Sequence, residues 1–397
     1  MLREIALRDF MAIGEETRLE LGVFTILYGP NSAGKSSIMR AAHLIACLLY
    51  GSGEYNEHRL KELANRESLA VGEASTLVGA YIELLRHRVK LRLTFDTRRL
   101  LPLMDLGLLR VLLELEVNGR RLKHWEDRSG VYIEVGGERR RVNLRPPLLS
   151  EYILLDPRYY ADLGLNEFEE FIQPVRRLVE AITGLEDRVD LPHLLGFLVS
   201  YKDALSDRAL LIERVNEGFA QAMELGREFL SELIDSVNFV IEDTFTLEEV
   251  KGWSGRVMLS FSSRRGAYDI SVSQLSDGLL RLLDIMLTLL YMDFRARHLR
   301  DLMKEGGLTP LMLIEGMENS IHVDWLLNFH EWLIERKPLV QVIAETHNGL
   351  LLSSVLKRGG SAYYIDESHV LHRITAENIG DIKLFRREYE AKLSLLE

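Results

Sequence analysis

The stretch that decides the fold reads Val23-Phe24-Thr25-Ile26-Leu27-Tyr28-Gly29-Pro30-Asn31-Ser32-Ala33-Gly34-Lys35-Ser36. Its first six residues are mostly apolar or β-branched, which predicts a buried strand. Its last eight match G-x-x-x-x-G-K-[ST], a loop whose backbone amides surround phosphate groups at the start of a helix. A helix is predicted over residues 35–50, so the motif lies between a strand and a helix. The sequence therefore predicts a phosphate-binding loop.

The loop also assigns roles to single side chains. Lys35 is expected to reach the β- and γ-phosphates, and the Ser36 hydroxyl is expected to bind Mg²⁺. The predicted nucleotide contacts come from one continuous run of residues, namely Gly29, Pro30, Asn31, Ser32, Ala33, Gly34, Lys35, Ser36 and Ser37.

Three lobes are predicted along the chain, over residues 1–160, 161–250 and 251–397. The first contains the phosphate loop and, over residues 77–144, short strands broken by turns, which predict an antiparallel sheet. The second has helical spacing over residues 166–240 and is expected to be a helical insertion. The third alternates strands and helices, so the fold class is α/β.

Composition limits the classes of protein that the chain can belong to. With 397 residues, 47% hydrophobic and 27% charged, the chain is an ordinary globular protein, which excludes disorder. Its formal net charge of −11 disfavours nucleic-acid binding unless basic residues gather on one face.

Cysteine usage and hydropathy predict a cytoplasmic protein that does not engage a membrane. The single cysteine, Cys47, cannot form an internal disulfide, and the opening MLREIALRDF is not a secretory signal. The most apolar predicted helix, residues 279–294, carries Arg281 and Asp284 and is too short to span a bilayer. A low glutamine count points to a thermophilic source.

Three further segments carry polar residues at places that suit nucleotide chemistry. Leu275-Ser276-Asp277-Gly278 starts a long apolar helix, where Ser276 or Asp277 can serve as N-cap. The apolar run 311–314 ends in Glu315, as expected of a carboxylate that holds Mg²⁺. A second apolar run, 342–344, leads to Glu345-Thr346-His347.

Taken in this order, the four motifs resemble the head of ABC-type ATPases of the SMC/RecF/OLD group, especially small prokaryotic proteins labelled "AAA family ATPase". The resemblance covers about residues 1–50 and 255–375. It implies a P-loop NTPase fold with a mixed sheet, an antiparallel β subdomain and an inserted helical subdomain. It also implies ATP with Mg²⁺, the metal held by Ser36 and Glu315.

The family mechanism implies an ATP-dependent homodimer. In this group two heads enclose two ATP molecules, so Ser276 and Gly278 would contact the γ-phosphate bound to the other subunit. His347 matches the switch histidine, which senses that phosphate. Hydrolysis would separate the heads, and the switch would act on a DNA-related process or on a separate effector protein.

The chain departs from the family pattern at the catalytic base. Alignment of the run from Glu318 to His322 places Glu315 in the metal position and Gly316 where the base belongs. Either Glu318 or Glu345 substitutes, or hydrolysis is slow. A register shifted by one would instead make Glu315 the base.

Other departures leave alternatives open. The glutamine loop is missing or replaced, because no glutamine lies between Ser36 and Gln173. Asp156 and Arg158 lie near its expected place, but Asp156-Pro157 is also typical of a plain turn at a strand end. Asn348 replaces the serine that usually follows the switch histidine. The basic groups near residues 98–99, 120–123, 139–145 and 264–265 are expected to face either DNA or solvent. The alternative functions are a nucleotide-sensing scaffold and the ATPase subunit of a two-component nuclease system.

Overall fold

The computed structural model describes residues 1–50, 63, 73–84, 87–101, 104–117, 119–127, 130–142, 236–245, 250–263, 266–271, 276–303, 309–382 and 385–386. The chain divides into two compact units. The first contains Met1–Asp187, His298–Gly316 and Leu339–Glu397. The second contains Arg188–Arg297 and Met317–Pro338.

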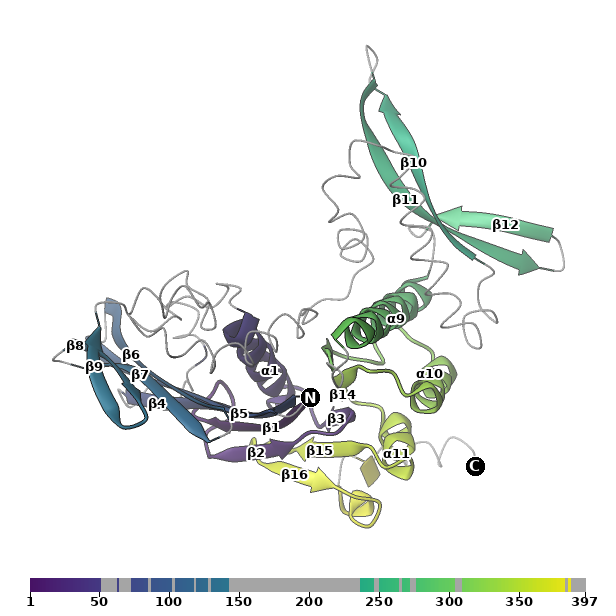
Figure 1. The fold of residues 1–397 in the computed structure, drawn as a ribbon. Helices are drawn as coiled ribbons and strands as arrows, with labels where there is room; N and C mark the ends of the chain where they lie inside the picture. The colour runs from purple at the N-terminus through teal and green to yellow at the C-terminus, as the bar shows by residue number, and fades with distance from the viewer. Residues whose placement is uncertain are drawn as a thin grey trace. The chain divides into compact units, whose positions relative to one another are not determined.

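A five-stranded mixed sheet forms the centre of the first unit, in the order β13-β14-β3-β15-β16 (Figure 1). Its strands are β13 (Leu311–Ile314), β14 (Gln341–Thr346), β3 (Phe24–Tyr28), β15 (Ser361–Ile365) and β16 (Leu371–Ile374). The first four are parallel, and only β16 runs antiparallel to its neighbour. Strands β13 and β3 are buried along their whole length, as continuous apolar runs in a parallel sheet should be. The predicted α/β class and mixed sheet are confirmed.

Two helices lie next to this sheet. Helix α1 (Lys35–Tyr50) starts at the end of the phosphate loop, as predicted, and contacts β1, β4 and β14 (Figure 1). It therefore packs between the mixed sheet and the antiparallel one. Helix α11 (Gly349–Lys357) packs on β3 and β15, and the short 3-10 helix η5 spans Ile379–Asp381.

The second sheet of the first unit is antiparallel and has eight strands in the order β2-β1-β4-β5-β6-β7-β8-β9. They are β1 (Leu2–Arg8), β2 (Thr17–Glu20), β4 (Glu73–Leu84), β5 (His87–Leu101), β6 (Met104–Val117), β7 (Arg120–Asp127), β8 (Gly130–Val135) and β9 (Glu138–Val142). Apolar residues such as Leu91, Leu113 and Ile133 alternate with charged ones and are buried. One face of the sheet is thus core and the other is solvated.

Buried Gln341 joins the two sheets of the first unit. Its side-chain oxygen accepts from the Leu2 amide at 2.9 Å, and its nitrogen donates to the carbonyls of Leu2 at 2.7 Å and Gly22 at 2.8 Å. The first strand of the chain is therefore held against the strand that leads to His347.

The second unit contains a three-stranded antiparallel sheet and two helices. The sheet is formed by β10 (Ser236–Phe245), β11 (Val250–Ser263) and β12 (Gly266–Ser271). Helix α10 spans Val323–Arg336, and α9 (Asp277–Met303) starts at its predicted residue, with its last residues in the first unit.

The helix predicted over 166–240 is wrong at its end, because residues 236–240 pair with β11. Valine and phenylalanine there suit a strand, and pairing with the next strand, β11, overrides the helical spacing. The rest of that prediction lies outside the described residues, so the three-lobe division stays a prediction. Within the described ranges, no helix is long and apolar enough to cross a membrane.

Candidate nucleotide-binding site

The phosphate loop is held in shape by close backbone contacts. A Cβ on Gly29 would overlap the carbonyl oxygen of Ile365, so only glycine lets β15 approach this closely. Ser32 adopts a left-handed backbone with φ 65°, and the amides of Ser37 and Ile38 both donate to the Gly34 carbonyl. This geometry directs the amides at the start of α1 into the loop, which suits an anion.

Lys35 is buried beneath the loop, with a relative exposure of 5%. Its Nζ donates to the carbonyl oxygens of Gly29 at 3.1 Å and Pro30 at 2.8 Å. A buried ammonium needs such partners. Phosphate oxygens are stronger acceptors than carbonyls, so the ammonium is placed to bind a nucleotide.

Ser36 and Glu345 contact each other at the carboxyl edge of the mixed sheet. The exposed Ser36 hydroxyl donates to Oε2 of the half-buried Glu345 at 3.2 Å. Sequence reasoning considered Glu345 only as a substitute base, whereas the structure brings it to the predicted metal ligand. The sequence feature that indicates this contact is the position of Glu345 near the end of a strand that pairs with β13.

Glu315 is exposed and directly follows β13. Because Ile314 pairs with Ala344, Glu315 lies level with Glu345 on the neighbouring parallel strand. Gly316 is buried, and its φ of 54° lies in the left-handed region. Glu318 belongs to the second unit.

His347 is exposed and follows β14 directly. Its position is fixed by the next residue, because Asn348 is the N-cap of α11 and its side chain accepts from the amides of Leu350 at 2.9 Å and Leu351 at 3.3 Å. Asparagine caps a helix as well as serine does, which explains why it replaces the usual serine.

The β15–β16 hairpin supplies a contact that sequence reasoning missed. Nδ1 of His369 lies 2.9 Å from the carbonyl oxygen of Ala33 in the phosphate loop. A carbonyl can only accept, so Nδ1 carries the proton. No local pattern marks His369, because its position depends on the fold of the hairpin.

In the second unit, Ser276 is exposed and precedes α9, and Gly278 is buried in the first turn of that helix. A Cβ on Gly278 would overlap the backbone carbonyl of Ser320, in the turn before α10. Residues 272–275, which include the first residue of the Leu275–Gly278 motif, lie outside the described residues, as do Asp156 and Arg158.

The donor set of the phosphate loop fits Mg²⁺. Magnesium prefers oxygen ligands and is usually held by one or two protein oxygens together with phosphates and water. A hydroxyl and a carboxylate in contact, Ser36 and Glu345, meet that description. Within the described ranges, no group of three or more His, Cys, Asp or Glu residues could hold a metal without phosphate.

Comparison with known proteins gives one family model, described as "AAA domain, putative AbiEii toxin, Type IV TA system", which matches residues 183–353. That range contains Ser276, Glu315 and His347 but not the phosphate loop. No curated protein matches the chain.

Three solved structures of SMC heads are similar to the chain. The first is the SmcHead bound to the C-winged helix domain of ScpA, at 12% identity, with 96% of this chain and 99% of that chain covered and a TM-score of 0.48. The head from Thermotoga maritima has 15% identity, coverage of 94% and 98%, and a TM-score of 0.41. The Smc head with an extended coiled coil, bound to the C-terminal domain of ScpA from Pyrococcus furiosus, has 12% identity, coverage of 97% and 99%, and a TM-score of 0.42.

The strand, loop and helix around Lys35, with β13 and β14 beside them, define the fold of a P-loop NTPase. The family model that matches residues 183–353 is described as an AAA domain, which agrees with a nucleotide-binding fold of this kind. This is the fold of nucleotide-binding ATPases.

Proposed function

We propose that the chain binds ATP with Mg²⁺ at the phosphate loop, and that ATP drives two copies to associate. The observation that carries the proposal is the buried Lys35, whose Nζ donates to the loop carbonyls of Gly29 and Pro30, where phosphate oxygens would be stronger acceptors. The Ser36 hydroxyl would hold the metal, with Glu315 at the edge of the same sheet. Mg²⁺, when bound, neutralises charge on the β- and γ-phosphate oxygens.

In the proposed dimer, each nucleotide lies between the phosphate loop of one copy and Ser276 with Gly278 of the other. The start of α9 supports this role, because a helix N-terminus attracts anions. His347 would sense the γ-phosphate. Hydrolysis would be slow, because Gly316 offers no base.

The test is molar mass by light scattering without nucleotide, with ADP, and with ATP and Mg²⁺. We expect a dimer only with ATP, and neither ATP binding nor dimer in Lys35→Ala. Lys357→Ala serves as the control, because it removes an exposed ammonium at the end of α11. A mass that does not respond to nucleotide would refute the switch.

Phosphate release separates this function from its alternatives. Turnover above that of Lys35→Ala indicates an ATPase, whereas ATP binding without turnover indicates a nucleotide-sensing scaffold. In a two-component nuclease system, the nuclease would be a separate chain acting as the effector protein.

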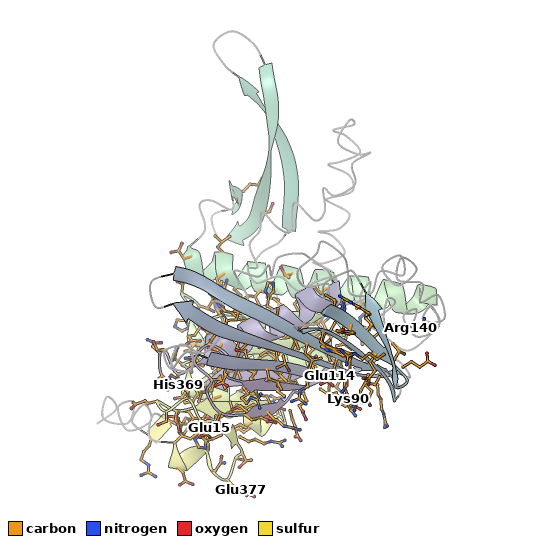
Figure 2. All side chains as sticks on the ribbon, turned by 90° about the vertical axis from the view of Figure 1, so that its left-hand side faces the viewer. Glu15, Lys90, Glu114, Arg140, His369 and Glu377 are labelled. Atoms are coloured by element: carbon orange, nitrogen blue, oxygen red, sulfur yellow. The ribbon has the colours of Figure 1, made fainter. Side chains whose placement is uncertain are left out.

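DNA binding is a second candidate, favoured by the solvated face of the antiparallel sheet. Among described side chains of β5 to β9, cross-strand pairing places seven cations and three carboxylates on this face. Lys90 and Glu114, labelled in Figure 2, are two of them. The cations are Arg88, Lys90, Arg92, Arg121, Lys123, Arg139 and Arg141, and the carboxylates are Glu114, Glu116 and Glu134.

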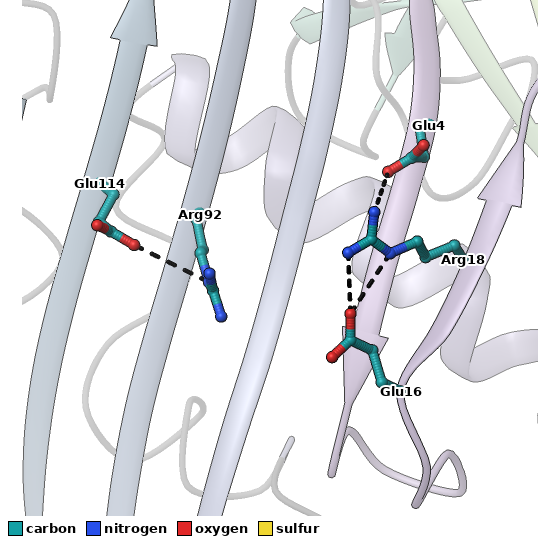
Figure 3. Close-up of polar contacts among 5 residues, drawn as sticks. All are labelled: Glu4, Glu16, Arg18, Arg92 and Glu114. Carbon is teal, nitrogen blue, oxygen red and sulfur yellow. Dashed lines mark hydrogen bonds and ion pairs between the residues drawn. The ribbon is translucent and has the colours of Figure 1, made fainter. Parts of the chain in front are cut away.

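Ion pairs occupy part of this basic face. Glu114 lies 3.9 Å from Arg92 (Figure 3) and 3.4 Å from Lys123. Glu116 lies 3.0 Å from Lys90, whose hydrogen bond lowers the pKa of that carboxyl. Arg139 instead stacks over the ring of Tyr132, with 3.8 Å from its guanidinium carbon to the ring centroid.

The DNA proposal is tested by binding of a labelled duplex at rising salt. Affinity should fall steeply with salt, and Arg139→Ala combined with Arg141→Ala should reduce the salt slope by about 2. Lys357→Ala should leave the slope unchanged. Absence of binding at low salt would remove this candidate.

A further inference from the structure

The carboxylate of Glu345 is placed where a ligand of Mg²⁺ belongs. Glu345 is the penultimate residue of β14, the strand between β13 and β3, and pairs with Leu27 on the strand that leads into the phosphate loop. Its Oε2 accepts the hydroxyl proton of Ser36 at 3.2 Å. Ser36 is the loop residue whose hydroxyl is expected to hold the metal.

The separation of these two oxygens fits a shared metal. Mg²⁺ takes octahedral ligands at about 2.0–2.1 Å, so two adjacent ligand oxygens lie about 3.0 Å apart. The observed 3.2 Å between Ser36 Oγ and Glu345 Oε2 is close to that spacing. Glu315, which directly follows β13 and lies level with Glu345, is exposed.

We propose that Glu345 binds the Mg²⁺ that accompanies ATP, adjacent to Ser36 in the metal's coordination sphere. This inference rests on the proposed function, because it assumes that the phosphate loop holds a nucleotide. Without the cation, the Glu345 carboxylate faces the phosphates and repels them. Nucleotide binding should therefore depend strongly on the divalent cation.

The experiment measures the affinity for a fluorescent ATP analogue with excess Mg²⁺ and again with EDTA, which requires no turnover. By linkage, the ratio of the two affinities reports how much tighter the metal binds when nucleotide is present. In Glu345→Gln, which keeps the size but not the charge, we expect the ratio to fall by about tenfold to a hundredfold. Binding in EDTA should be equal to or tighter than that of the natural protein.

Two further variants make the comparison specific. Glu377→Gln removes an exposed carboxylate of the same unit and should leave the ratio unchanged. Glu345→Asp keeps the carboxylate on a shorter side chain. Its ratio of affinities with Mg²⁺ and with EDTA should lie between those of Glu345→Gln and the natural protein. Circular dichroism of each variant establishes that it is folded, and Glu345→Asp carries the test if Glu345→Gln is not.

The outcomes separate the two proposals. A ratio in folded Glu345→Gln within about twofold of the natural one overturns the metal assignment. The metal assignment is also overturned if Glu345→Gln loses the same fraction of its affinity with Mg²⁺ as with EDTA. The Glu345 carboxylate would then only support the loop through Ser36. If the natural protein binds the analogue no better than Lys35→Ala does, the proposed function itself fails.

Discussion

The backbone carbonyl of Ser320 lies against the Cα of Gly278, where a side chain at residue 278 would have to begin. Both residues belong to the second unit, so the contact exists within a single chain. The resemblance to ABC-type heads assigns this glycine a contact with the nucleotide of another subunit. The structure adds a packing reason for glycine that needs neither nucleotide nor partner.

Gly278→Ala should therefore destabilise the chain in the absence of nucleotide. The added methyl must displace a backbone carbonyl, so we expect the free energy of unfolding to fall by about 1–3 kcal/mol. Denaturant unfolding without ATP measures this. Gly380→Ala is the control, because a Cβ there meets nothing within 4 Å. Equal stability of Gly278→Ala and the natural protein would contradict the packing reason.

His369 should support ATP binding through the phosphate loop rather than through turnover. Its ring holds the Ala33 carbonyl at 2.9 Å, which keeps the loop amides turned toward the phosphates. His369→Gly tolerates the left-handed φ of 63° and removes the ring. We expect ATP affinity to fall about fivefold, the equivalent of one hydrogen bond.

Calorimetric titration with ATP measures that loss, and His369→Asn provides the rescue. Asparagine also tolerates a left-handed backbone and carries a donor, so its affinity should be closer to that of the natural protein. A His369→Gly variant that binds ATP as tightly as the natural protein would show that the loop does not need this contact.

Asp366 should make the hairpin sensitive to strong acid. Burial raises the pKa of its carboxyl, but hydrogen bonds from His372 and the amides of Val370 and Ser368 outweigh burial and lower the pKa below its usual value. A group with a depressed folded pKa contributes stability above its unfolded pKa of about 3.9. That contribution is lost as the pH falls through the folded pKa.

A carboxyl NMR titration measures this pKa directly. In His372→Ala, which removes the side-chain bond at 2.9 Å, the pKa of Asp366 should rise toward its usual value. An Asp366 pKa at or above the usual value in the natural protein would contradict the assigned cause.

The parts of this fold that could be predicted are those set by residues adjacent in the sequence. Helix α1 starts at Lys35 because the glycine loop and the apolar strand before it are adjacent in sequence. Strand β10 was missed because its partner β11 comes later in the chain, and pairing with it replaces helical spacing. The contact of Glu345 with the loop could be approached only from its place near a strand end, because it joins residues 309 positions apart. The contact of His369 was beyond prediction, because it joins residues 336 positions apart and no local pattern marks it.

Gly316→Glu should raise the rate of ATP hydrolysis. A glutamate there would occupy the position of the family's base, and a general base contributes about a hundredfold or more. The gain should be smaller, because the backbone φ of 54° costs a glutamate about 1 kcal/mol. Phosphate release at saturating ATP is the measurement. Gly316→Asn, which tolerates this backbone and adds no base, should leave turnover unchanged, and an equal rate in both variants would refute the assignment of the position.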